Sequence, residues 1–445
     1  MVGTYTLTRV TPSARLCHIA RCAKLAFIVI SLVLVAIHGH TLVSSLRRNP
    51  LADTNVVSLD LCPACVGTSL CRRFAAGQVM ADHPFRLRFF GADGEIGTLA
   101  GNREGPRKVV LKRLAAVSEM VTLDQDLCLR VTGKKTCNIS FAVFHSEFNR
   151  LSEPPQPRLL LPEHVEGWSE PVHCPSQRLL DRIVRRFGEV RDSGSFLLRH
   201  LRPSERVSLL VTLAVNPEPL IFQSFPPDEG WPFAKYLGAC GRIAVASYVG
   251  PELSNFRVSP WEKRVDLAIQ ALEMAEQLST NEMDFSLYLL DVRPEAFSVG
   301  ARDGRLIATQ ARHVLIVDRR HVTKTQPKLY SIPYETPHIS CHTQSSSDCY
   351  HIPTAHSKLC SRLNSDHNYY AICRNLLAPP EAGGAGWGLL HSPPASISAR
   401  FGTILASCLH PDRPGGRVQA ARELKELLRS TVANTTFLRV NKLLT

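Results

Sequence analysis

The segment from Tyr288 to Gln310 constrains the fold of this 445-residue chain more than any other stretch. Its pattern predicts an apolar strand, an acidic turn at Asp291, and a hairpin closed by the Asp303-Gly304 pair. The active sites of phosphate-transfer enzymes often contain residues in this order, with one carboxylate before the hairpin, a metal ligand within it and another carboxylate after it. Only the first of these three groups is present here.

The elements predicted ahead of this segment follow a known order. In "RKVVLKRL", Val109 and Leu111 alternate with Val110 and Lys112, so a strand would present an apolar face on one side and Lys112 on the other. A strand over residues 242–250 and a long helix over residues 261–278 come next. Protein-kinase-like folds use this order, so we expect an α+β, bilobed protein-kinase-like fold.

Other predicted elements surround this framework. Ser176 is expected to cap a helix over residues 175–187, and Ser204 is expected to cap another. Strands are predicted over 220–225 and 313–318, and a last amphipathic helix over 416–429. The polar side of the 175–187 helix carries four arginines: Arg178, Arg182, Arg185 and Arg186. This side is either a solvated face or a docking surface.

The N-terminus predicts the compartment. Basic residues precede a 13-residue apolar run from Leu25 to Ile37, as in a secretory signal. A bilayer span needs about 20 residues, and the run reaches that length only with His38 to Val43 included. Signal peptide and signal anchor therefore both remain open for residues 1–50. Either one would place the bulk of the chain in the secretory lumen, with a membrane attachment if the segment is not cleaved.

The charge of the chain also limits its partners. The formal net charge is +13, but the arginines are scattered and no basic run is interleaved with aromatic residues. We therefore expect no nucleic-acid partner. Acidic partners, matrix polyanions or a membrane surface fit this charge better.

Cysteine usage agrees with a lumenal location. Twelve of the 14 cysteines follow the apolar run, and disulfides are the default in an oxidising compartment. We expect these twelve to be disulfide candidates: Cys62, Cys65, Cys71, Cys128, Cys137, Cys174, Cys240, Cys341, Cys349, Cys360, Cys373 and Cys408. Zinc is the alternative at two places, in the cysteine-rich start and among the cysteines and histidines His338, His342, His351 and His356. Two sequons, at Asn138 and Asn434, are compatible with lumenal glycosylation.

Long motifs identify a family resemblance. They include "CPACVGTSLCRRF", "VVLKRLA", "NPEPLIFQSFPPDEGWPFAKYLGACGR", "LYLLDV", "DHNYYAICRNLL" and "AARELKELL". With these motifs the chain closely resembles the divergent protein kinase domain family, subfamily 2, of the secretory pathway. The resemblance implies an N-lobe-like region at 51–240, with a cysteine-rich start and an insertion, and a C-lobe-like helical region at 241–445.

The resemblance also implies a location and a role. It implies a Golgi-lumenal protein that travels in COPI-type coated vesicles and is secreted. It further implies a growth and survival signal that raises phosphoinositide-kinase/Akt signalling, or a trafficking role. The implied partner is a cell-surface receptor or a vesicle-trafficking protein.

Carried over by motif, the resemblance assigns Lys112 as the phosphate-binding lysine and Asp291 as the catalytic aspartate. Glu119, seven residues after Lys112, is the best candidate for the partner of that lysine. Where the family has a metal-binding Asn and Asp, this chain has Ala296 and Gln310. Neither residue supplies an anionic oxygen for Mg²⁺, so we expect no metal site and no cofactor, with ATP and Mg²⁺ as the alternative.

Two residues offer a rescue of the metal site. Glu295 adjoins the missing Asn, and Asp318 lies eight residues beyond Gln310. Strand geometry, at about 3.3 Å per residue, would carry Asp318 away unless the strand turns back.

Three functions remain after these observations. The first is a secreted or Golgi-lumenal pseudokinase that acts by binding. The second is an active lumenal kinase with a rebuilt metal site, and the third is a metal-dependent binding module at residues 338–373. A serine protease or esterase is disfavoured because no Gly-x-Ser-x-Gly elbow is present.

Overall fold

The computed structural model describes residues 29–35, 49–83, 94–101, 105–152, 159–189, 200–339 and 347–443, the last twelve of them as backbone only. Residues 29–35 of the N-terminal apolar run are helical, and the rest of the predicted signal segment lies outside the described residues. Within the described part, no helix combines the length and the hydrophobicity that crossing a bilayer requires.

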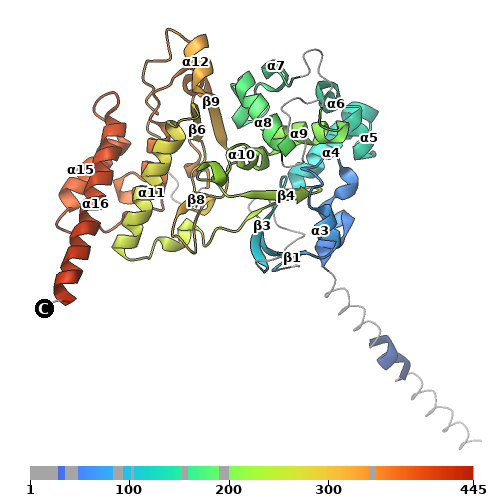
Figure 1. Cartoon of the computed structure of the whole chain (residues 1–445), viewed down its shortest axis with the longest axis horizontal. Coiled ribbons are helices and arrows are strands. Elements are labelled where there is room, and N and C mark those ends of the chain that lie inside the picture. Colours follow the sequence, from blue (N-terminus) through green and yellow to red (C-terminus); the bar gives the residue numbers. More distant parts are fainter. Residues whose placement is uncertain are drawn as a thin grey trace, which may run out of the picture.

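The first lobe is built on a five-stranded antiparallel sheet (Figure 1). Its strands run in the order β1-β2-β3-β5-β4. Val109, Leu111 and Val245 are fully buried on one face, against the N-terminal segment. The strands are β1 (Val79–Ala81), β2 (Glu95–Leu99), β3 (Arg107–Arg113), β4 (Tyr236–Cys240) and β5 (Ile243–Ser247).

Helices fill the sequence between β3 and β4. They are α4 (Val117–Thr132), α5 (Ile139–Phe144), α6 (Glu147–Ser152), α7 (Pro162–Val165), α8 (Gln177–Glu189), α9 (Pro203–Val215) and α10 (Glu218–Ser224). Short helices α2 (Thr54–Val57) and α3 (Cys71–Ala75) precede β1. Met120 of α4 and Val207 of α9 share one apolar cluster, so this insertion packs as part of the first lobe.

The second lobe packs helices around two small two-stranded antiparallel sheets (Figure 1). β6 (Phe285–Leu289) pairs with β9 (Val314–Asp318), and β7 (Phe297–Val299) pairs with β8 (Leu306–Ala308). The helices are α11 (Trp261–Ser279), α12 (Arg319–Thr325), α13 (His356–Ser361), α14 (His367–Ile372), α15 (Ser398–Leu409) and α16 (Gly416–Leu443), with a π-helical turn at Cys373–Leu377. The main core joins α8 and α10 to this lobe.

Most predicted elements are confirmed. The strand that carries Lys112, the helix over 261–278, the Asp303-Gly304 hairpin and the strand over 313–318 all form. Ser176 caps α8, because its Oγ accepts from the Leu179 amide at 3.1 Å. The first sheet continues to Ser247, beyond the lobe boundary predicted after residue 240, because β5 pairs with both β3 and β4.

Two local predictions are wrong. Residues 220–225 were predicted as a strand, but they belong largely to helix α10. All of its residues are buried, so the apolar run has no periodicity to reveal the helix. Pro219 suits its first turn, where a missing amide costs nothing. Ser204 does not cap α9; the Arg202 amide instead donates to Glu205 Oε2 at 2.9 Å.

Disulfides confirm the expectation from cysteine usage. Five bridges join the described cysteines: Cys62–Cys65, Cys71–Cys240, Cys128–Cys137, Cys174–Cys360 and Cys373–Cys408. Cys349 is disulfide-bonded as well, and Cys341 lies outside the described residues. The cysteine-rich start is therefore a pair of bridges and not a zinc site.

The zinc hypothesis for residues 338–373 is wrong for its described members. Cys349 and Cys360 are oxidised and keep no thiolate to bind a metal. His356 Nε2 lies 2.9 Å from Glu170 Oε2, and His338 packs on His410. His342 lies outside the described residues, and among those described no three His, Cys, Asp or Glu side chains are placed to hold a metal.

Candidate functional site: the cleft between Lys112 and Asp291

Lys112 is fixed in the cleft by two short hydrogen bonds. Its Nζ donates to Glu218 Oε1 at 2.6 Å and to the Thr309 carbonyl at 2.6 Å. The lysine and glutamate side chains are 8% and 6% exposed, so the pair is shielded from water. The other oxygen of Glu218 accepts from the Ala311 amide at 2.8 Å. The pair therefore links β3 and α10 with the segment after β8.

The predicted partner of Lys112 was wrong. Glu119 lies in the first turn of α4, where its carboxylate accepts from the Ala116 amide at 3.0 Å and so caps its own helix. It also faces Arg312 at 3.5 Å. Glu218 was missed, although it lies within the family motif "NPEPLIFQSF". A carboxylate so deeply buried needs a cation, and Lys112 is that cation.

Asp291 follows β6 and is held by its own neighbour. Arg293 donates to Asp291 Oδ1 at 2.8 Å and to Oδ2 at 2.5 Å, a bidentate pair. The carboxylate side chain is 10% exposed and the arginine 40% exposed. Both carboxylate oxygens thus face a guanidinium, which competes with any hydroxyl that Asp291 would deprotonate.

The strand before Asp291 is clamped by side chains from α14. His367 Nε2 donates to the Leu289 carbonyl at 2.8 Å, because a carbonyl oxygen can only accept, and Nε2 therefore carries the proton of the ring. Asn368 accepts from the Leu289 amide at 2.9 Å and donates to the Leu287 carbonyl at 2.9 Å. Sequence reasoning quoted these residues within "DHNYYAICRNLL" but gave them no role.

A second clamp holds the turn itself. Asn375 Nδ2 donates to the Val292 carbonyl at 3.0 Å and to the Tyr350 carbonyl at 2.7 Å. Asn375 is fully buried, so these bonds have no competition from water. The motif therefore fixes the backbone on both sides of Asp291.

The two degenerate metal positions lie together. The Gln310 amide donates to the Ala296 carbonyl at 3.2 Å, and both residues line one cavity with Asp291, Arg293 and His313. Its volume is about 190 Å³. Two of the three side chains at this place offer no anionic oxygen, and the third is engaged by Arg293. These residues do not fit Mg²⁺, which requires oxygen ligands in near-octahedral geometry.

Comparison with known proteins places this cleft in a family. Residues 210–411 match the family model described as the protein-kinase domain of FAM69. Divergent protein kinase domain 2A of Homo sapiens is 48% identical over 93% of this chain and 96% of its own length. The Xenopus tropicalis protein of the same name is 48% identical over 92% and 95%, respectively. Divergent protein kinase domain 2B of Homo sapiens is 30% identical over 87% and 86%.

The chain belongs to the divergent protein kinase domain 2 family. Its kinase-like domain and its mixture of helices and sheets agree with that membership. Membership in the divergent protein kinase domain 2 family indicates a pseudokinase or a divergent kinase.

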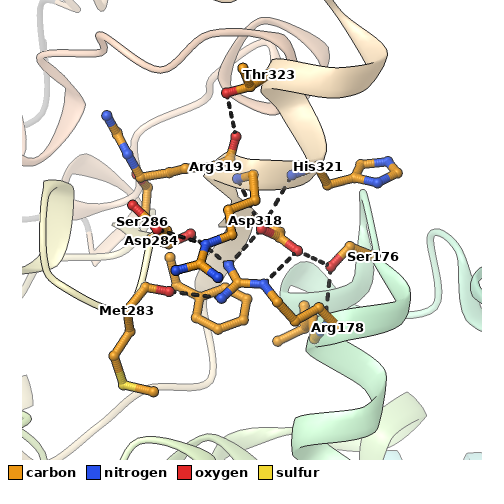
Figure 2. Close-up of polar contacts among 12 residues, drawn as sticks. Ser176, Arg178, Met283, Asp284, Ser286, Asp318, Arg319, His321 and Thr323 are labelled. Atoms are coloured by element: carbon orange, nitrogen blue, oxygen red, sulfur yellow. Dashed lines mark hydrogen bonds and ion pairs between the residues drawn. The ribbon is translucent and has the colours of Figure 1, made fainter.

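Of the two proposed rescues, Asp318 does not restore a metal site in this divergent protein kinase domain 2 chain. Asp318 pairs across the sheet with Phe285, at the end of β6 remote from Asp291. Its carboxylate binds Arg178 at 2.6 Å and Ser176 at 2.7 Å (Figure 2). Glu295 is exposed and lines a cavity of about 310 Å³ that also contains Lys112 and Gln310. It is the one rescue candidate beside the cleft.

His313 adds a titratable group to the cleft wall. Burial lowers the pKa of its imidazole, while the Asp291 carboxylate acts in the opposite direction and Arg312 adds to the lowering. His313 is therefore a neutral neighbour of Asp291 at neutral pH, so it contributes no cation to the cleft.

Proposed function

We propose that this chain is a pseudokinase that acts by binding a partner. The single observation that carries the proposal is the state of Asp291, which pairs with Arg293 while Ala296 and Gln310 occupy the two metal positions. The Lys112–Glu218 pair joins the two sides of the cleft. The site thus retains its scaffold without the groups that would hold a divalent ion.

The physical reason lies in the charge of phosphoryl transfer. Charge develops on the transferred group and its oxygens, and metal ions or fixed cations must neutralise it. In this cleft the cation of Arg293 already faces Asp291, whereas the Lys112–Glu218 pair is of the kind that active kinases also form. A metal would have to recruit Glu295 and displace Arg293, which is the alternative of an active lumenal kinase with a rebuilt site.

We further propose that the protein works in the secretory pathway, in the Golgi lumen and COPI-type vesicles, and is secreted. The disulfides, the apolar N-terminal run and the exposed sequon at Asn138 support this location. From the family resemblance noted in the sequence we propose a growth and survival signal that raises phosphoinositide-kinase/Akt signalling through a cell-surface receptor. A role in vesicle trafficking is the other form of the same binding function.

A thermal-shift experiment tests the cleft. The purified chain is melted with ATP alone and with ATP plus Mg²⁺ or Mn²⁺, beside the Asp291→Ala variant. The proposal expects no shift that depends on the metal. A metal-dependent shift that Asp291→Ala removes, together with labelled phosphoprotein product, would establish the active kinase instead.

A gain-of-function variant is the matched positive control. Ala296→Asn combined with Gln310→Asp restores the two ligand types at positions that the structure brings together. We expect this variant to gain a metal-dependent shift that the wild type lacks. For the location, sequencing the mature N-terminus of secreted protein decides between a cleaved signal peptide and an anchor.

A further inference from the structure

Helix α5 lies at the outer edge of the first lobe, away from the second lobe (Figure 1). Ile139 and Val143 are buried and attach it to the apolar cluster of the insertion. Asn138, directly before the helix, is exposed, and with Ile139 and Ser140 it forms the sequon Asn-Ile-Ser. A sugar attached to Asn138 would therefore extend into solvent.

The side chain of Asn138 is held in one orientation. Its Oδ1 accepts from the Phe141 amide at 3.0 Å. Cys137, the residue before it, is bridged to Cys128 of α4, so the backbone ahead of the sequon is anchored as well. N-glycosylation modifies the other end of the side-chain amide, Nδ2, and leaves Oδ1 able to accept. Attachment of a sugar thus keeps this hydrogen bond.

An aromatic platform, made of Phe141 and His145, lies beside the sequon. Phe141 is 52% exposed and is the most exposed phenylalanine among those that the structure describes. Its ring stacks on that of His145, with 4.0 Å between the centroids and 26° between the planes. His145 Nδ1 donates to the Phe141 carbonyl at 2.9 Å, which orients the histidine ring. The platform is therefore held in place while it remains exposed.

Helix geometry sets the open face of the platform towards the sequon. Residues three apart are neighbours on a helix surface, and helical side chains lean towards the start of the helix. Phe141 follows Asn138 by three residues, whereas His145 stacks on the ring from one turn further along. The ring face that His145 leaves open is thus on the side of Asn138. The face of an aromatic ring carries partial negative charge and attracts C–H groups, which a sugar ring presents.

We propose that Asn138 carries an N-linked glycan whose first sugar packs on the aromatic platform. In the lumen, Asn138 Nδ2 attacks the first sugar carbon of an oligosaccharide linked to a lipid diphosphate. A bond forms between that carbon and Nδ2, the bond from the carbon to the diphosphate oxygen breaks, and Nδ2 loses one proton. The inference rests on the secretory location proposed above, and it adds the modified atom and the surface that the sugar covers. The glycan is favoured over a protein partner because it is tethered three residues from Phe141.

Site mapping of the full chain, expressed in animal cells and recovered from medium and cells, tests the modification. Enzymatic deglycosylation in heavy-oxygen water converts a glycosylated asparagine to a labelled aspartate, which mass spectrometry locates. Ser140→Ala is the negative control, because it removes the sequon and keeps Asn138. Ser396→Asn, added to Ser140→Ala, is the positive control, because it places the same tripeptide, Asn-Ile-Ser, in an exposed turn before α15.

We expect the label at Asn138 in the wild type, no label there in Ser140→Ala, and a label at position 396 in the double variant. A label at position 396 with none at Asn138 of the wild type overturns the modification and leaves the secretory location standing. No label at either position overturns the location and the modification together.

Hydrogen exchange of the α5 amides tests the contact with the platform. The wild type is compared with Ser140→Ala, and Phe141→Ala is compared with the variant that carries both changes. The difference between the two comparisons removes the effect of Ser140→Ala itself. We expect the glycan to slow exchange about threefold more when Phe141 is present, as for other aromatic contacts. Equal slowing with and without Phe141 overturns the packing of the sugar on the platform.

Discussion

Lys112 forms its ion pair with Glu218 of helix α10, and not with Glu119 of the helix that follows its own strand. The two residues are 106 positions apart in the sequence. The insertion between β3 and β4 therefore supplies the partner of the cleft lysine, so the insertion is a structural part of the site.

The Lys112–Glu218 pair predicts a large difference between two glutamate variants. Glu218→Ala leaves the Lys112 ammonium buried without its partner, which typically costs 3–5 kcal/mol, about 4 kcal/mol here. Glu119→Ala removes a helix cap at an exposed site and should cost about 1 kcal/mol. Urea unfolding with disulfides intact measures both. Equal losses would show that the buried pair does not stabilise the cleft.

The α14 clamp predicts a second destabilising change. Asn368→Ala leaves the Leu289 amide and the Leu287 carbonyl buried without partners, so we expect a loss of about 2–3 kcal/mol. Gln419→Ala on α16, whose hydrogen bond is exposed, is the control and should change stability by less than about 0.5 kcal/mol. Hydrogen exchange of β6 amides should speed up in the first variant and stay constant in the second. Unchanged exchange in Asn368→Ala would contradict the clamp.

His367 predicts that acid destabilises the fold. Burial lowers the pKa of His367 to about 4, although the hydrogen bond to Leu289 acts against this and the charge of Arg417 adds to it. In the unfolded chain His367 binds a proton near pH 6.5, whereas in the folded chain it stays neutral until a lower pH. The contribution of neutral His367 to folding stability is therefore complete above pH 6.5 and falls as the pH drops towards 4. At pH 5 the loss amounts to about 2 kcal/mol.

The variant His367→Gln isolates this effect. Its amide can still donate to the Leu289 carbonyl but cannot be protonated, so the melting temperature should depend less on pH between 7 and 5. Burial and the neighbouring His410 also lower the pKa of His338 to about 4, and that group remains in both proteins. If the melting temperature depends on pH with the same slope in the variant and the wild type, another group causes the acid sensitivity.

The long disulfides predict unequal contributions to stability. Cys174–Cys360 spans 186 positions and Cys128–Cys137 spans 9. In the loop-entropy model, removing the first costs about 5 kcal/mol and removing the second about 3 kcal/mol. Paired alanine variants and chemical unfolding measure the two values. Non-reducing peptide mapping should recover Cys174 joined to Cys360, and any other partner would contradict the pairing.

The sequence was enough to place the residues that local motifs carry. Lys112 sits in a strand with a clear alternation, and Asp291, Ala296 and Gln310 surround a hairpin with a clear turn signal. Glu218 could not be found this way, because its helix is buried on every side and so shows no periodicity. That the described cysteines form disulfides was predicted from cysteine usage, but their pairing depends on contacts between residues as much as 186 positions apart.

The segment at the start of α8 is attached to the second lobe twice. Cys174 forms a disulfide with Cys360, and Arg178, a few residues after Cys174, forms an ion pair with Asp318. α8 packs on α10, and α10 carries Glu218. Regulated kinases switch by swinging the element that pairs with the lysine in and out. Here α10 packs against a helix that is covalently attached to the second lobe, so we expect the lysine and glutamate to stay paired whether or not a partner is bound.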